Sequence, residues 1–194
     1  MKVLQWLGAI LIALSMSGCG YNQFQNLDEA VTANQSRVLN VYQKRADLIP
    51  NIVATVQGET SFEKETLIKV VEARAKATQV TPPDFDKATP EQMKKFVEAQ
   101  KEIGSGLARL LAVSENYPNL KANAAFADLR RQLTEVESQA TAARGMYIKS
   151  IRDYNVLARS FPTNLTAAIF GYKIKPQIQF EDEAAIKKTP QVKF

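Results

Sequence analysis

Apolar residues recur in alternating steps of three and four between Leu120 and Phe161. The positions of this stripe are Ala122, Phe126, Leu129, Leu133, Val136, Ala140, Ala143, Tyr147, the small Ser150, Tyr154, Leu157 and Phe161. The spacing averages about 3.5 residues, the repeat with which helices pack against one another in coiled coils and bundles. We therefore expect one long helix here, roughly 60 Å in length, with its stripe buried against other helices.

A second stripe of the same spacing lies upstream, from Phe24 to Ile52. It has Asn34 and Arg45 at two of its apolar positions, and polar residues at such positions typically set register or partner geometry. The pattern predicts a helix over residues 21–57, continuous but bent at Pro50, which ends before Gly58.

Two further striped segments complete the pattern. Thr60 and Glu63 have the spacing of a capping box, so we expect a helix from there to about Gln79. Thr89, followed by Pro90 and by a glutamine at position 92, predicts the start of another helix. The apolar positions of that helix are Met93, Phe96, Gln100, Ile103, Leu107 and Leu110, and the run 114–119 interrupts it.

These segments predict an all-α fold. Four striped helices joined by short connections are typical of a long antiparallel up-and-down four-helix bundle, which we assign to residues 19–171. Residues 164–170 read as one or two helical turns that end at Gly171. Residues 172–194, with Pro176 and Pro190, read as an extended tail with little structure of its own.

The N-terminus has the pattern of a secretory signal peptide. Lys2 is followed by an almost wholly apolar run, Val3 to Leu14, and then by Ser15, Met16, Ser17 and Gly18 before Cys19, with Met16 where a lipobox more often has Leu. The apolar run is short for a membrane-spanning helix, and the cysteine after Gly18 resembles a bacterial lipobox. We expect residues 1–18 to be the signal and Cys19 to carry lipid. The alternatives are an uncleaved signal anchor and an incidental cysteine.

A lipid on Cys19 would place the rest of the chain outside the cytoplasm. In a Gram-negative cell this means the periplasmic side of the outer or inner membrane, and Gly20, in place of an aspartate, favours the outer one.

Composition narrows the possible chemistry. The 194 residues contain no histidine and one cysteine, which excludes Ser-His and Cys-His catalysis, HExxH zinc sites and an intrachain disulfide. The net charge is +5, but basic and acidic residues alternate, so no nucleic-acid surface is indicated. Carboxylate pairs such as Glu98 with Glu102, or Glu135 with Glu137, are expected on solvated helix faces. We predict no enzyme activity, no cofactor and no metal site.

Several blocks of residues together resemble one family. They are 44–53 (KRADLIPNIV), 56–58 (VQG), 63–67 (EKETL), 71–75 (VEARA), 112–122 (AVSENYPNLKA), 154–155 (YN), 161–162 (FP) and 170–171 (FG). This order of motifs resembles the LemA family over nearly all of the chain after Cys19. The resemblance implies a membrane-attached, mostly helical protein with no established enzymatic activity.

The polar residues of these motifs, with Asn123 directly after the block 112–122, form our candidate site, either a structural ion-pair network or a polar site for a peptide, ligand or ion. We expect Arg45 and Arg74 to meet carboxylates such as Glu72 or Glu115 at one end of the bundle. The full set is Arg45, Asp47, Asn51, Glu65, Glu72, Arg74, Glu115, Asn116 and Asn123.

The resulting functional hypothesis is a lipid-anchored bundle that acts by protein–protein contact at the cell envelope, as a scaffold or adaptor. Its partners would be the membrane, through Cys19, and an unidentified envelope protein. The alternative is a structural envelope protein that associates with copies of itself.

Overall fold

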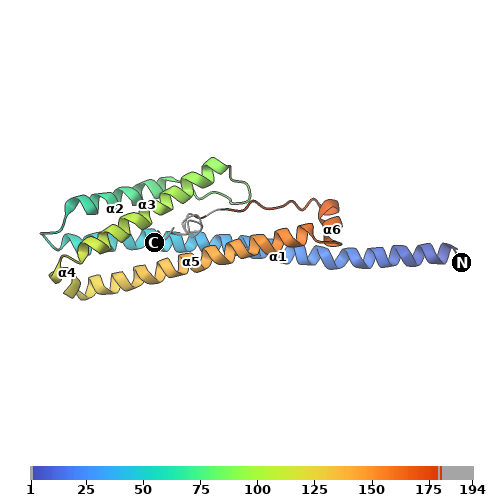
Figure 1. Cartoon of the computed structure of the whole chain (residues 1–194), viewed down its shortest axis with the longest axis horizontal. Coiled ribbons are helices and arrows are strands. Elements are labelled where there is room, and N and C mark those ends of the chain that lie inside the picture. The colour runs from blue at the N-terminus through green and yellow to red at the C-terminus, as the bar shows by residue number, and fades with distance from the viewer. Residues whose placement is uncertain (1, 179, 181–194) are drawn as a thin grey trace, which may run out of the picture. The chain divides into compact units, whose positions relative to one another are not determined.

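The computed structural model of the chain describes residues 2–178 and 180, with side chains described from Gly20 onward. This part of the chain is all-α, as predicted, and contains no strand (Figure 1). Its helices are α1 (Lys2–Gln57), α2 (Lys64–Gln79), α3 (Pro90–Ser114), α4 (Pro118–Ala122), α5 (Ala124–Arg159) and α6 (Thr163–Phe170).

The chain divides into two compact units. Unit 1 consists of Met1–Ser36 and Gly145–Gln177, and unit 2 consists of Arg37–Arg144 and Ile178–Phe194. Helices α1 and α5 each contribute residues to both units.

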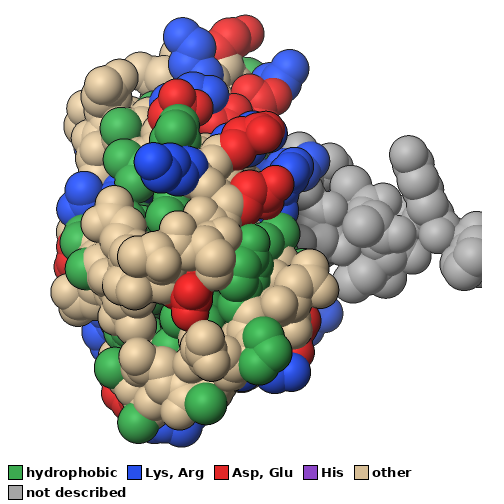
Figure 2. Space-filling view, turned by 90° about the vertical axis from the view of Figure 1, so that its left-hand side faces the viewer, with side chains coloured by type: hydrophobic (Ala, Val, Ile, Leu, Met, Phe, Trp, Pro, Cys, Tyr) green, Lys and Arg blue, Asp and Glu red, His purple; other side chains and the backbone are tan. Residues whose placement is uncertain are grey.

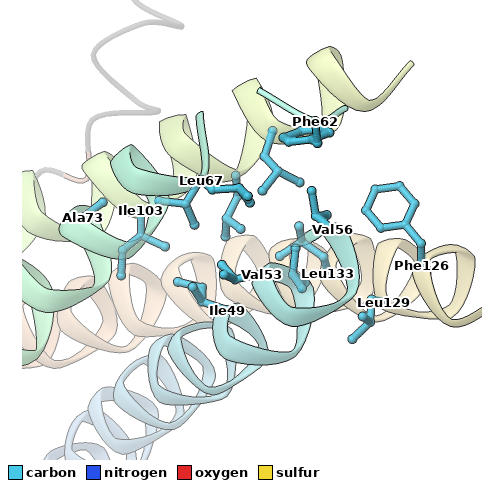
Figure 3. Packing of buried hydrophobic residues seen from close by; sticks show 14 of the residues in the cluster. Ile49, Val53, Val56, Phe62, Leu67, Ala73, Ile103, Phe126, Leu129 and Leu133 are labelled. Carbon is cyan, nitrogen blue, oxygen red and sulfur yellow. The ribbon is translucent and has the colours of Figure 1, made fainter. Parts of the chain in front are cut away.

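Five helices contribute to the core of unit 2. Ile49 and Val53 of α1, Leu67 of α2, Ile103 of α3 and Leu133 of α5 belong to one buried cluster (Figure 3). Phe62, from the α1–α2 connection, and Leu120 of α4 are part of the same cluster. Because each of these helices contributes apolar residues to the cluster, burial of those residues holds the helices together.

The core of unit 1 is aromatic. The ring of Phe24 on α1 stacks on that of Tyr172 with centroids 4.5 Å apart, and it meets the ring of Tyr154 on α5 edge-on at 5.7 Å. Val31, Tyr147 and Ile151 are also buried.

The extended segment after α6 is held in unit 1 by side chains. Buried Asn155 accepts a hydrogen bond from the backbone N–H of Lys175 at 2.8 Å and donates one to its carbonyl oxygen at 2.9 Å. The Lys175 ammonium lies 2.8 Å from Asp28 and over the ring of Tyr154. Residues 172–178 form no helix or strand, as predicted. The contacts of Tyr172 and Lys175 nevertheless fasten the part up to Gln177 to unit 1. The rest of the predicted tail, apart from residue 180, lies outside the described residues.

The long stripe predicts the burial of α5 correctly along its length and fails at both ends. Every stripe residue from Phe126 to Leu157 is buried. Ala122 and Phe161 are exposed, because α5 begins at Ala124 and ends at Arg159. Both residues therefore lie outside the helix whose periodicity assigned them to the core.

The remaining helix boundaries test the capping predictions. The Thr89 box is present: Thr89 Oγ1 accepts from the backbone N–H of Gln92 at 3.2 Å, and the Gln92 side chain accepts from the N–H of Thr89 at 2.9 Å. The box predicted at Thr60 is wrong, because α2 begins at Lys64. The Glu63 carboxylate instead accepts from the hydroxyl of Thr66 at 2.7 Å.

Helix α1 passes through Pro50 without interruption and ends at Gln57, before Gly58, as expected. It also includes the backbone of residues 2–19, whose side chains lie outside the described part. Lipidation of Cys19 and removal of residues 1–18 therefore stay predictions. Within the described part of the chain, no helix combines the length and apolarity needed to span a bilayer.

Candidate functional site

Arg45 is the buried cation of unit 2. It occupies a stripe position of α1, as the sequence indicates, and only 3% of its surface is exposed. Its Nη1 donates to Glu137 Oε1 on α5 at 3.0 Å. Its Nη2 donates to two acceptors of Gln100 on α3, the backbone carbonyl at 2.8 Å and Oε1 at 2.7 Å. Burial of a charge is costly without such partners, so the guanidinium sets the register of three helices.

A cavity of about 420 Å³ adjoins this network. Gly104, Ser105 and Ala108 leave space on the α3 side, and a Cβ added at Gly104 would lie 3.6 Å from Arg45 Nη1. The aromatic side chains of Tyr42 and Phe180 also line the cavity. Its full lining is Tyr42, Arg45, Val97, Gln100, Lys101, Gly104, Ser105, Ala108, Glu137, Arg144 and Phe180. The volume falls within the range of small-ligand and peptide-side-chain sites.

The electrostatics of the cavity favour groups that accept hydrogen bonds. Arg45, Lys101 and Arg144 line it together with one carboxylate, that of Glu137. The Nε–H of Arg45 is buried and has no acceptor among the described atoms. A buried donor without an acceptor carries a free-energy penalty.

The structure does not gather the nine predicted site residues in one place. Arg74 on α2 donates from Nε to the carbonyl oxygen of Ala46 at 3.0 Å and so ties α2 to α1. Glu72 is exposed and lines a separate space of about 360 Å³ between α2 and α3. The carboxylate partners expected for Arg45, such as Glu72 or Glu115, were wrong. The carboxylate that Arg45 contacts is that of Glu137.

Three other members lie on exposed helix faces. Asp47 accepts from the Gln43 side chain at 2.8 Å, one helical turn away. Glu65 pairs with Lys69, also one turn away, and this contact lowers the pKa of the carboxyl. Asn51 is exposed, and its carbonyl oxygen accepts from the Thr55 hydroxyl. These contacts are local to one helix and form no shared site.

The last three members belong to the turn between α3 and α5. Glu115 lies 2.7 Å from Lys121 Nζ and 3.1 Å from Arg130 Nη1. The hydrogen bond from Lys121, with the charges of both cations, lowers the pKa of this carboxyl. The backbone N–H of Asn116 donates to the Val113 carbonyl. Asn123 Oδ1 accepts from the Phe126 N–H at 3.1 Å, the bond made by a helix N-cap.

Sequence reasoning missed the roles of Gln100 and Glu137. A signal for Gln100 was present, because it occupies an apolar stripe position of its helix, as Arg45 does. Two polar residues on the buried faces of different helices are candidates to pair. Glu137 carries no such signal, since it lies one residue beyond the stripe position Val136.

Two further carboxylates singled out in the sequence, Glu98 and Glu102, are solvated. Glu98 lies 3.8 Å from Lys94, Glu102 lies 3.2 Å from Lys76, and both acids are about half exposed. Charged side chains of both signs are interspersed on the face drawn in Figure 2. No group of three or more Asp, Glu or Cys side chains in the described residues is placed to hold a metal ion.

Comparison with known proteins identifies the family. The model of the LemA family matches residues 34–194. The chain belongs to the LemA family. It is 29% identical to Protein LemA of Metamycoplasma hominis over 144 residues. The matched region covers 74% of this chain and 55% of that protein.

Two other relatives are magnetosome proteins by name. Identity is 22% over 186 residues to Magnetosome protein MamQ of Magnetospirillum gryphiswaldense, covering 88% of this chain and 67% of the relative. The chain is 23% identical over 169 residues to Magnetosome protein MamQ 1 of Paramagnetospirillum magneticum. The matched region covers 79% of this chain and 62% of the relative. This LemA family chain therefore spans between about half and two thirds of the length of the relatives it matches. None of the three names describes a catalytic activity.

Proposed function

We propose that this LemA family protein is anchored at the cell envelope by lipid on Cys19 and acts by binding another envelope protein, without catalysing a reaction. The cavity beside Arg45 is the observation that carries the binding role. The sequence from Lys2 to Cys19 supports the anchor, since a charged start and an apolar run are typical of a secretory signal and the cysteine after Ser17 and Gly18 resembles a lipobox.

The cavity suits a segment of a partner protein that supplies hydrogen-bond acceptors. Carboxylates and backbone carbonyl oxygens of such a segment would meet Arg45, Lys101 and Arg144, while Tyr42 and Val97 offer apolar contact. A rigid wall built from three helices needs little ordering on binding, which favours affinity.

Site-specific crosslinking in intact cells tests this role. A photoreactive amino acid at Ala108, which lines the cavity and is exposed, is compared with the same amino acid at Ala142, an exposed alanine of α5 that does not line it. We expect an adduct of discrete mass with a different protein from position 108 and none from position 142. Equal adducts from both positions, or none, would show that the cavity does not receive a partner.

Self-association is the second candidate function. Ile68 and Val71 lie three residues apart on α2, and both are exposed. Ile68 also lines a space of about 470 Å³ with Phe62 and Leu67. This exposed apolar face suits a second copy of the chain. An adduct with twice the mass of the chain, or a size that grows with concentration and is lost in Ile68→Lys, would favour it over the adaptor role.

A further inference from the structure

Helix α6 has its large apolar residues on the outside. Leu165 and Ile169, one helical turn apart, are 56% and 73% exposed, whereas the small residues Thr166 and Ala167 are buried. Phe161, just before the helix, is 80% exposed. We call Phe161, Leu165, Ile169, Phe170 and Ile174, all exposed, the α6 apolar surface. A helix in water normally has the opposite arrangement, so this surface requires an apolar neighbour.

The attachment of α6 places this surface next to the residue that would carry lipid. Gly20 of α1 is buried against α6, where an added Cβ would lie 3.0 Å from Thr166 Oγ1 and 3.4 Å from the methyl group of Thr163. Only a glycine allows this approach without a shift of the neighbouring side chains. Residue 20 directly follows Cys19, so α6 lies within one residue of the proposed anchor. Figure 1 shows the first turns of α1 continuing past α6.

Aromatic side chains gather at the same place. The ring of Tyr21 on α1 lies 5.0 Å from that of Phe170 and 6.3 Å from that of Tyr172. Tyr21 and Phe170 are partly exposed. Tyrosine rings are enriched at the boundary between hydrocarbon and water, because they combine an apolar body with a polar tip.

The charge of this segment complements an anionic surface. The sequence contains no aspartate or glutamate from Tyr154 to Phe180, whereas Arg159 and Lys173 are present and exposed. Lys175 lies in the same segment and pairs with Asp28. An apolar face flanked by cations is the pattern of a segment that lies in the headgroup region of a bilayer.

We infer that the α6 apolar surface rests in the headgroup region of the membrane, so that α6 is a second contact between the protein and the bilayer. The occupant is lipid because the surface adjoins residue 20, where the proposed lipid anchor holds the chain at the bilayer. The inference rests on that anchor. If the inference is right, unit 1 has a defined orientation at the membrane, with the α6 apolar surface toward the lipid, in addition to its attachment through the acyl chains.

Quenching by brominated lipid tests the inference on the lipid-modified protein purified from membranes. Trp6, the single native tryptophan, lies in the segment that the proposed processing removes. Trp6→Phe serves as the background so that any unprocessed chain adds no emission. Tryptophan is then introduced as Ile169→Trp, with Phe161→Trp as a second variant of the same surface. The control is Met146→Trp, which is 48% exposed on α5. Position 146 lies 13 residues before the end of α5, which is roughly 20 Å along the helix. An interfacial helix penetrates only about 5–10 Å, so a side chain at position 146 should stay outside the acyl region.

The variants are reconstituted on vesicles of phosphatidylethanolamine and phosphatidylglycerol with brominated acyl chains. We expect the emission of Ile169→Trp and Phe161→Trp to be quenched at least about threefold more than that of Met146→Trp, as expected for side chains at acyl depth. Exchange of phosphatidylglycerol for neutral phosphatidylcholine should reduce this quenching.

The other outcomes contradict the inference in distinguishable ways. Equal, weak quenching of all three variants on protein that floats with the vesicles would overturn it while leaving the anchor intact. Blue-shifted but unquenched emission at position 169 would mean that protein, and not lipid, covers the surface. Protein that fails to float with the vesicles would overturn both the anchor and the inference.

Discussion

The ion pair between Arg45 and Glu137 provides the sharpest test of the core of unit 2. Glu137→Ala removes the carboxylate and leaves the guanidinium, which is 4% exposed, with Gln100 as its remaining hydrogen-bond partner. A hydrogen bond to a charged group contributes about 1.5–3 kcal/mol. Because the Glu137 side chain is 40% exposed and therefore partly screened, we expect the loss of free energy of unfolding to be about 2 kcal/mol.

A double-mutant cycle separates the pair from simple truncation. Arg45→Met keeps the apolar stem and removes the buried charge, so in this background Glu137→Ala should cost less than about 0.5 kcal/mol, which leaves a coupling energy of about 1.5 kcal/mol. The assay is urea unfolding of a chain beginning at Gly20, followed by helical circular dichroism. An equal cost of Glu137→Ala in both backgrounds would refute the pairing.

Three further predictions concern single positions. Asn155→Ala removes both hydrogen bonds to Lys175, so it should lower the free energy of unfolding by about 2 kcal/mol and speed proteolysis between residues 172 and 178. Thr89→Ala should cost about 1 kcal/mol through loss of its cap, whereas Thr60→Ala, which caps no helix, should leave urea unfolding unchanged. The lowered pKa of Glu115 means that its stabilisation is present above the ordinary carboxyl range and is lost as pH falls through the lowered value. Glu115→Gln should therefore make the free energy of unfolding less dependent on pH on the acid side. An unchanged dependence on pH in this variant would show that the ion pairs at this turn do not form.

Periodicity predicted the buried faces well because burial follows the helix repeat. In α5, every stripe residue from Phe126 to Leu157 is buried. The predicted ends of this helix were wrong because a periodic pattern contains no information about where the backbone hydrogen bonds of a helix stop. Asn123, assigned to the candidate site because it flanks the turn, proved to be the cap that starts α5 and leaves Ala122 outside it.

Local signals were sufficient for some turns only. Thr89, Pro90 and Gln92 satisfy every requirement of a capping box, and the box forms. Thr60 and Glu63 have the correct spacing, yet the helix starts after Glu63. The loop around Phe62 is set by burial of that ring in the core, where it lies 4.8 Å from the ring of Tyr117. A tertiary contact therefore overrides the local preference.

The candidate site was only partly accessible to sequence reasoning. Burial of Arg45 follows from its stripe position, but its partner depends on how far one helix is displaced along another. That displacement decides between Glu137, Glu72 and Glu115, and no sequence spacing encodes it. The inverted polarity of α6 is visible as apolar residues in the sequence, but their exposure emerges only when Thr166 and Ala167 are seen packed inward.

The lipid anchor on Cys19 is the central claim of the proposed function. Its most direct test is the intact mass and membrane partitioning of the native protein beside Cys19→Ser. The account predicts a mature native chain that begins at a lipid-modified Cys19 and sediments with membranes, and a mutant that is unprocessed or released to the soluble fraction. An unmodified chain that retains Met1 in both proteins would contradict it and would identify the N-terminal segment as an uncleaved signal anchor.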